Sequence, residues 1–306
     1  MASRVVVVGS SNIDLVMKME HLPRVGETVT DATFVQAFGG KGANQAVGAA
    51  RAGGDVAFVG CVGDDAYGAQ VKGHLEADGV DTRFVFTEAG VASGTALILV
   101  GGAGENYISV APGANYRLTP AHVDRAREAL ARAEVIVTQC EIPPETLDHV
   151  IALGSRLGKA VMLNLAPART IDDVSLAKLA YLAVNETEAE FLTGRKVATD
   201  RDVDAAVGAL LAMGPKTVVL TLGARGAHVA GDGGRALVPG FAVEAVDTTA
   251  AGDVHCGALA VALVEGRPLL EAVRFANAAA ALSVTKLGAQ PSAPGRKDIE
   301  ALLSRG

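Results

Sequence analysis

The sequence predicts an α/β fold built on a doubly wound, mostly parallel sheet that helices cover on both faces. Six short apolar runs, separated by amphipathic stretches with helical spacing, carry this prediction, at residues 4–8, 56–59, 135–138, 160–163, 181–184 and 217–221. The runs are apolar throughout and do not alternate with polar residues, as expected of strands buried on both faces. The helix-like stretches between them indicate crossover connections and therefore parallel pairing.

Two segments interrupt this rhythm, residues 14–38 and 95–110. Strand-like residues alternate there with polar ones without a helix between them, so we expect a small antiparallel β lid inserted in a single α/β domain that spans residues 1–306. One face of such a sheet needs a cover, which favours a lid that closes over a ligand and pairs with a second subunit in a homodimer. Ordinary edge hairpins without a gating role remain the alternative.

The composition limits the choice of partners. The chain has 306 residues, enough for one large domain, and a formal net charge of −7 at pH 7. We therefore expect no basic face for nucleic acid or for an anionic membrane surface. The longest clean apolar run, residues 258–264, is far shorter than the roughly 20 residues that span a bilayer. Three widely spaced cysteines argue against a disulfide framework or a metal cluster, so we expect a cytoplasmic protein with small-molecule partners.

The strongest local signal lies at residues 247–253, Asp-Thr-Thr-Ala-Ala-Gly-Asp, which precede an apolar helix-like stretch. The small residues Ala251 and Gly252 would let the backbone approach a ligand, and a helix beginning here would direct free N–H groups and its positive dipole end at a phosphate. Asp253, in the first turn, could accept the proton of a hydroxyl that attacks the phosphorus. A simple interaction with the helix dipole is the alternative for Asp253.

A glycine-rich turn at residues 38–44, Phe-Gly-Gly-Lys-Gly-Ala-Asn, leads into a helix of small residues. Gly40, Gly42 and Ala43 allow close approach of the backbone. Lys41 offers charge-assisted donors, and Asn44 offers both a donor and an acceptor for vicinal hydroxyls. The segment is typical of a polyol site, and equally of a tight turn into a packed helix.

Further polar residues follow the predicted strands. Asn12 and Asp14 occupy alternate positions after the first strand and so share one face, and Glu141 follows the strand at residues 135–138. The loops at the carboxyl ends of parallel strands form the ligand crevice of an α/β sheet, so all three side chains could reach a polyol. Polar turns that satisfy their own backbone are the alternative.

Two later turns suit a nucleotide. Asn185 and Glu188 form an N-cap with an acid three residues on, and Glu188 is also placed to hold magnesium through water. A polar turn after the strand at residues 217–221 suits a base or a phosphate edge, and consists of Thr221, Leu222, Gly223, Ala224, Arg225 and Gly226. Helix capping and a plain turn are the respective alternatives. The sequence has neither the glycine fingerprint of a dinucleotide site after its first strand nor a P-loop.

Together these segments resemble the ribokinase family of carbohydrate and nucleoside kinases over residues 5–302, in the same order. The similarity is carried by residues 26–29 (Gly-Glu-Thr-Val), 37–46 (Ala-Phe-Gly-Gly-Lys-Gly-Ala-Asn-Gln-Ala), 185–190 (Asn-Glu-Thr-Glu-Ala-Glu), 247–253 and 288–292 (Gly-Ala-Gln-Pro-Ser). The resemblance implies a ribokinase-like fold and ATP-dependent phosphorylation of D-ribose at its primary hydroxyl, giving ribose 5-phosphate and ADP. The alternatives are a same-fold kinase for deoxyribose, fructose or a nucleoside, and a non-catalytic sugar-binding or regulatory protein on the same scaffold.

The resemblance also implies a role for each matching position. Asp253 would be the catalytic base, and Ala251 and Gly252 would donate backbone hydrogen bonds to the transferring phosphate. The sugar hydroxyls would be held by Asn12, Asp14, Gly40, Lys41, Asn44 and Glu141. The ATP site would be lined by Asn185, Thr221, Gly223 and Gly226. A monovalent cation, usually potassium, would be held mostly by backbone carbonyls at Asp247, Thr249, Ser283, Lys286, Gly288 and Ser292.

A few positions depart from the family pattern. Val254-His255-Cys256 stands where the family usually has Thr-Phe-Asn, so Cys256 is either unusually reactive or a buried, inert thiol. Asn277, which we also assign to the ATP site, replaces a His often found near the adenine. Val184 replaces a Pro that often precedes Asn185.

Overall fold

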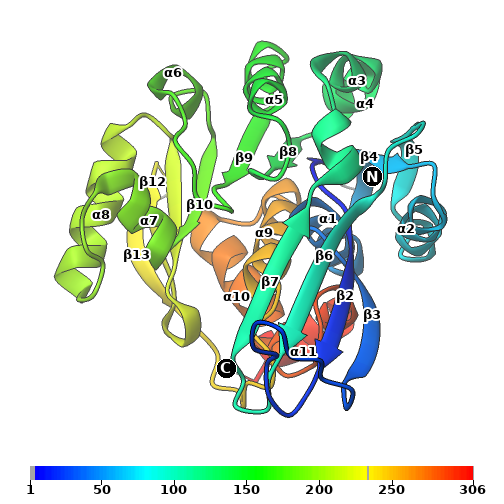
Figure 1. The fold of residues 1–306 in the computed structure, drawn as a ribbon. Coiled ribbons are helices and arrows are strands. Elements are labelled where there is room, and N and C mark those ends of the chain that lie inside the picture. The colour runs from blue at the N-terminus through cyan, green and yellow to red at the C-terminus, as the bar shows by residue number, and fades with distance from the viewer. Residues whose placement is uncertain (1–3, 233, 306) are drawn as a thin grey trace.

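The computed structural model describes residues 4–232 and 234–305, and within them nine strands form one large sheet (Figure 1). Pairing is parallel from β5 to β11, and the last two strands, β12 and β13, add an antiparallel edge. In order across the sheet the strands are β13 (Gly234–Pro239), β12 (Gly226–Gly231), β11 (Thr217–Thr221), β10 (Tyr181–Asn185), β9 (Ala160–Asn164), β8 (Val135–Thr138), β1 (Arg4–Val8), β4 (Asp55–Gly63) and β5 (Asp81–Glu88).

The predicted fold class is confirmed. All six apolar runs lie in this sheet, and β1, β8 and β11 have the predicted bounds. No expected strand corresponds to β5, β12 or β13, which lie at or near the sheet edges. β5 mixes buried, half-buried and exposed residues, and most residues of β13 are exposed, so these strands lack the continuous apolar run of a central strand.

Helices cover both faces of the sheet (Figure 1). Val5 and Val7 of β1 pack into one apolar core and Val6 and Val8 into the other, which explains why residues 5–8 are all apolar. The first core includes residues of α1 (Lys41–Arg51), α2 (Ala66–Ala77), α9 (Ala251–Val264), α10 (Leu269–Ser283) and α11 (Arg296–Leu303). The second includes residues of α3 (Pro120–Arg125), α4 (Arg127–Arg132), α5 (Pro144–Arg156), α6 (Asp173–Leu176), α7 (Glu186–Thr193) and α8 (Asp200–Ala212).

Short 3-10 helices form part of the loops, at η1 (Gly113–Arg117), η2 (Gly223–Arg225) and η3 (Gln290–Ser292). Among the residues described, no helix combines the length and the apolar character needed to cross a bilayer.

A second, smaller sheet stands in the lower part of the view in Figure 1, in blue and teal. Its strands, in order across the sheet, are β3 (Thr33–Gly39), β2 (Asn12–Lys18), β6 (Gly94–Val100) and β7 (Asn106–Ala111). The outer pairs are antiparallel, as expected, whereas the central pair β2 and β6 is parallel. Large apolar side chains remain exposed on this sheet, among them Phe34, Leu97, Tyr107 and Ile108. Its action as a lid stays a prediction.

Candidate active site

The glycine-rich turn holds the start of α1 against the loop that follows β1. The Ala43 amide donates to the Ser10 carbonyl at 2.8 Å. A Cβ at Gly42 would lie 2.6 Å from the backbone nitrogen of Ser10, and one at Gly40, whose φ is 85°, would lie 2.6 Å from the Ser11 Cα. Only glycine fits these two positions, because any larger residue would separate the helix from the loop.

Asp253 lies in the first turn of α9 and faces the start of α1. Its Oδ2 accepts from Asn44 Nδ2 at 2.9 Å, and its Oδ1 accepts from Gln45 Nε2 at 3.0 Å. The side chain is only 6% exposed, and this burial raises the pKa of Asp253, although Lys41 and the two amide donors oppose the shift. The site thus contains a desolvated carboxylate that is more basic than an ordinary aspartate.

Lys41 is surrounded by carboxylates. Burial would lower the pKa of Lys41, but the charges of Asp253, Glu141 and Glu188 outweigh it and raise the pKa above its usual value. Lys41 therefore stays protonated and brings a fixed positive charge to the site.

The start of α9 has the geometry of an anion site. Ala250, before the helix, has a φ of 59°, in the left-handed region. Among the residues described, the amides of Gly252 and Asp253 have no hydrogen-bond partner, whereas the Ala251 amide donates to the Thr248 carbonyl at 3.3 Å. A Cβ on Gly252 would meet no described atom within 4 Å, so the backbone borders open space. Free amides at a helix start attract phosphate.

The predicted polyol residues lie around the glycine-rich turn. Glu141 Oε2 accepts from Ser10 Oγ at 2.5 Å and from the Lys41 amide at 3.0 Å. The carboxylate of Asp14 lies against Gly39, where a Cβ would be 2.2 Å from its Oδ2. Burial, and secondarily the charge of Glu141, raises the pKa of Asp14 to about 6. Two carboxylates, one of them readily protonated, thus flank the start of α1.

Asn12 is held by a residue that the sequence analysis missed. Asn115, in η1, donates from Nδ2 to Asn12 Oδ1 at 2.8 Å, and its Oδ1 accepts from the Ser11 amide at 2.9 Å. Asn115 is 2% exposed and 103 residues from Asn12 in sequence. No local motif could have linked the two, because only the fold brings them together.

A cavity of about 640 Å³ lies beside the start of α9. Its lining includes most of the residues predicted to bind nucleotide, namely Asn185, Thr221, Gly223, Ala224, Gly226, Gly252 and Asn277. Apolar side chains, including Phe241, Val243 and Val284, form much of the remaining wall. Such a concave, mostly apolar pocket next to free amides suits a nucleoside attached to phosphates.

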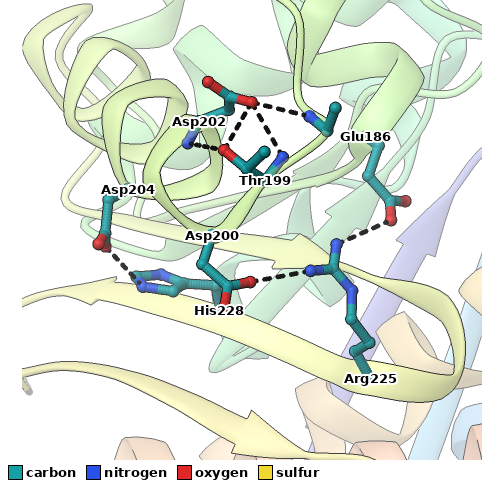
Figure 2. Close-up of polar contacts among 8 residues, drawn as sticks. Glu186, Thr199, Asp200, Asp202, Asp204, Arg225 and His228 are labelled. Atoms are coloured by element: carbon teal, nitrogen blue, oxygen red, sulfur yellow. Dashed lines mark hydrogen bonds and ion pairs between the residues drawn. The ribbon is translucent and has the colours of Figure 1, made fainter.

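Arg225 is the exception among these predictions. It is not part of the cavity lining within the described residues, and Figure 2 shows its guanidinium between two acids. Its Nη1 lies 3.0 Å from Asp200 Oδ1, and its Nη2 lies 3.7 Å from Glu186 Oε1. These exposed ion pairs link the turn after β11 to α7 and α8. Nothing in this geometry directs Arg225 at a nucleotide.

A smaller cavity of about 170 Å³ adjoins the first, and its lining includes both Asp253 and two of the predicted nucleotide residues, Asn185 and Thr221. Lys41, Glu188, Gly252 and Asp253 contribute to its lining. Glu188 also completes a capping box, because its Oε2 accepts from the Asn185 amide at 2.9 Å. Burial raises the pKa of Glu188. A carboxylate in this position fits a magnesium ion that keeps its own water ligands.

Asp247 joins the two loops predicted to hold a monovalent cation. Its Oδ1 accepts from the amide and the hydroxyl of Thr249, at 2.9 and 2.6 Å, and its Oδ2 accepts from the Gly288 amide at 2.8 Å. Burial would raise the pKa of Asp247, but these hydrogen bonds outweigh it and lower the pKa. The carboxylate therefore remains charged.

The remaining predicted ligands of the cation lie on the loop that connects α10 to η3 or at its ends, and they are Ser283, Lys286, Gly288 and Ser292. Ser283 ends α10, and its carbonyl accepts from the Lys286 amide at 3.1 Å. Ser292, in η3, is fully buried and donates from its hydroxyl to the Ala289 carbonyl at 2.7 Å. Backbone carbonyls and carboxylates are the oxygen ligands that suit potassium, and the two loops carry groups of both kinds.

Each residue at which the chain departs from the family pattern is buried. His255 and Asn277 both line the larger cavity, and His255 Nε2 lies 3.1 Å from Asn277 Oδ1. Cys256 is 2% exposed, and burial raises the pKa of its thiol, which favours the inert alternative. Burial likewise raises the pKa values of Cys61 and Cys140, each to about 12.

A chain of buried amides orients the candidate base and also escaped the sequence analysis. Gln45 Nε2, which donates to Asp253, also lies 3.0 Å from Asn164 Oδ1, and Gln45 Oε1 accepts from Gln139 Nε2 at 2.6 Å. Gln45 and Gln139 are fully buried. Their bonds fix which end of the Gln45 amide faces the carboxylate.

Comparison with known proteins adds independent findings. Residues 2–296 match the family model described as pfkB family carbohydrate kinase. A ribokinase from Haemophilus influenzae is 40% identical over 298 residues, covering 97% of both chains. A deoxyribokinase from Salmonella typhi is 38% identical over 301 residues, covering 98% of both. The structure of an Arabidopsis thaliana ribokinase complexed with ribose and ATP superposes with a TM-score of 0.93 at 36% identity, covering 99% of both chains.

Proposed function

Because the chain belongs to the pfkB family of carbohydrate kinases, we propose that it transfers the terminal phosphoryl group of ATP to the primary hydroxyl of D-ribose, giving ribose 5-phosphate and ADP. Full-length similarity to ribokinases, one of them seen with ribose and ATP, supports this substrate pair. The observation that carries the chemistry is the position of Asp253. Its buried carboxylate accepts a hydrogen bond from Asn44 of α1, and the amides of Gly252 and Asp253 in the same helical turn have no partner among the described residues.

Asp253 acts as the base in this proposal. It accepts the proton of the sugar hydroxyl as that oxygen attacks the phosphorus, and the raised pKa favours this transfer. The Gln45 and Asn44 amides hold the carboxylate in place, so little reorganisation is needed. The amides at the start of α9 and the charge of Lys41 stabilise the negative charge of the transferring group.

Two ions complete the proposal. Glu188 would hold magnesium through water, and magnesium would neutralise charge on the ATP phosphates. The loops joined by Asp247 would hold potassium, which would fix the backbone geometry next to the start of α9. The donor sets described above fit both ions.

The small sheet is proposed to close over the sugar and to pair with a second copy of the chain. The uncovered apolar side chains of β3, β6 and β7 support this pairing, because large exposed apolar patches mark interaction sites. The proposed compartment is the reducing cytoplasm, in keeping with three cysteines that are all unpaired.

The test is an ADP-release assay with ribose, 2-deoxyribose, fructose and a nucleoside as acceptors, with the product identified by ³¹P NMR. We expect ribose to give the highest kcat/KM. The similarity to a deoxyribokinase makes 2-deoxyribose the second candidate, and a higher kcat/KM for it would replace ribose as the substrate. Absence of acceptor-dependent ADP release would leave the non-catalytic alternative.

A further inference from the structure

The loop between α10 and α11 contacts both the region before α9 and the glycine-rich turn. Gly288 donates from its amide to Asp247, which precedes the anion site at the start of α9. Further along this loop, Gln290 Nε2 donates to the Gly39 carbonyl at 3.3 Å, although the two residues are 251 positions apart in sequence. Gln290 is 2% exposed, so it reaches the turn from within the protein.

Arg51, the last residue of α1, holds the backbone of this loop. Its Nη1 donates to the Gln290 carbonyl at 2.7 Å and to the Ala293 carbonyl at 3.2 Å. The same guanidinium donates from Nε and Nη2 to the two carboxylate oxygens of Asp78, at 2.7 and 3.0 Å. A bidentate pair of this kind fixes the orientation of an arginine. The point from which the Gln290 side chain extends is therefore set by α1, the helix that begins at the glycine-rich turn.

The hydrogen bond to Gly39 orients the Gln290 amide and restrains the peptide that accepts it. A carbonyl only accepts, so the end of the Gln290 side chain that faces Gly39 must be the amide nitrogen. The Gly39 carbonyl belongs to the peptide bond that joins Gly39 to Gly40, whose φ is 85°. Glycine has the widest choice of backbone conformations, so a peptide between two glycines needs outside contacts to hold one of them. Gln290 supplies such a contact directly before Lys41, the first predicted sugar ligand on α1.

The Gln290 amide contributes less to stability than an apolar side chain would. Its Oε1 is buried without a hydrogen-bond partner among the described residues. A buried oxygen in this state is costly, and a side chain of the same length without a polar end group, such as methionine, would avoid that cost. The amide is therefore poorly explained by packing, which favours a role for its donor in ligand binding.

We propose that Gln290 is a positioning residue whose side-chain amide, held in place by Arg51, keeps the Gly39–Gly40 peptide in the conformation that binds the sugar. The inference rests on the proposed function, which assigns the sugar to the residues around this turn. A turn that leaves this conformation part of the time binds its ligand more weakly, in proportion to the fraction of molecules that remain competent. Gln290 thus sets the affinity for the sugar and takes no part in the chemical step.

The test compares the intact wild-type protein with Gln290→Met, which keeps the length of the side chain and lacks the donor. We expect the Kd for ribose, measured by calorimetry without nucleotide, to rise roughly 3- to 10-fold, as loss of one neutral hydrogen bond implies. The KM for ribose should rise by a similar factor. In contrast, kcat and the KM for ATP should change much less, because saturating sugar restores the bound conformation of the turn. The melting temperature should stay near that of the wild type, because the unpaired oxygen is removed together with the hydrogen bond.

Gln36 provides a matched control. It lies on β3, the strand that ends at Gly39, and its Nε2 donates to Gln70 Oε1 at 2.8 Å. This hydrogen bond joins two exposed side chains and does not involve the backbone of the turn. Gln36→Met should therefore leave the Kd and the KM for ribose unchanged.

Two results would overturn the inference: an unchanged Kd for ribose in Gln290→Met, or a lower melting temperature with equal changes in the KM values of both substrates, as a purely structural role predicts. If Gln290→Met does not fold, Arg51→Lys decides, because lysine keeps the charge beside Asp78 but lacks the planar fork that holds the loop. A higher Kd for ribose with an unchanged KM for ATP would then support the proposal, and a wild-type Kd would refute it. If the wild type binds no sugar, the proposed function fails and this inference fails with it, whereas ribose binding that Gln290→Met leaves unaltered removes only this inference.

Discussion

Replacing Asp253 by asparagine tests the proposed base with little change in shape. The amide cannot take a proton from the sugar hydroxyl, so we expect kcat to fall by roughly 10²- to 10⁴-fold, the usual contribution of a positioned general base. Ribose affinity should change much less, because the other polyol residues, including Asp14 and Glu141, are unaltered.

The structure also predicts the effect on stability. In Asp253→Asn, the remaining oxygen can accept from only one of two donors, and Gln45 keeps its bond to Asn164. The loss thus falls mainly on Asn44, at about 1–3 kcal/mol for an unsatisfied buried donor. The raised pKa of Asp253 means that burial of its charge already costs stability at neutral pH, and the neutral amide removes that cost. The two effects oppose each other, so the melting temperature should stay near that of the wild type.

The assay combines ribose-dependent ADP formation, calorimetry with ribose, and thermal melting. Asp298→Asn is the matched control, because Asp298 also lies in the first turn of a helix, α11, but is exposed and is not among the candidate site residues. It should lose only about 0.3–1 kcal/mol of helix-dipole stabilisation and keep full turnover. If Asp253→Asn retains turnover within a few-fold of the wild type while the control behaves as expected, the carboxylate is not the base.

Three further predictions concern the periphery of the site. Burial raises the pKa of Asp14 to about 6, so its carboxylate protonates as the pH falls from 8 to 5, and the KM for ribose should rise over that range. Asp14→Asn should flatten this dependence of KM on pH, and an unchanged dependence in the variant would exclude Asp14 from sugar binding. Replacing potassium by a large organic cation should slow the wild type, and Asp247→Asn should abolish this response; equal rates of the wild type in both salts would remove the ion site. Asn115→Ala releases Asn12 and should raise the KM for ribose several-fold with a smaller change in kcat, so equal effects on both constants would contradict a positioning role.

The sequence predicted the central part of the fold because β1, β8 and β11 are buried on both faces, and such strands carry apolar residues in succession without alternation. The edge strand β13 remained hidden, since most of its residues are exposed and tertiary pairing decides its conformation. The parallel pairing of β2 with β6 was also out of reach. Residues of the two strands are paired across about 80 positions of chain, and nothing in their local pattern encodes direction.

The candidate site divides in the same way. Gly40, Gly42 and Asp253 were found because close backbone approach and helix starts require particular residue types at fixed spacing. Gln45 and Asn115 were not found as positioning residues, although both are buried and hydrogen-bonded to candidate site residues. Amides serve equally well on the surface, so their role depends on partners that only the folded chain supplies.

The buried cysteines make the protein convenient for fluorescence work. All three have raised pKa values, and because only a thiolate attacks maleimide readily, the native thiols should not react in the folded state. A dye attached through a new cysteine at the exposed Ser109 of β7 would then report from a single place on the small sheet. Paired with a second dye on α8, it would allow the distance between the two to be followed in single molecules as sugar and nucleotide arrive.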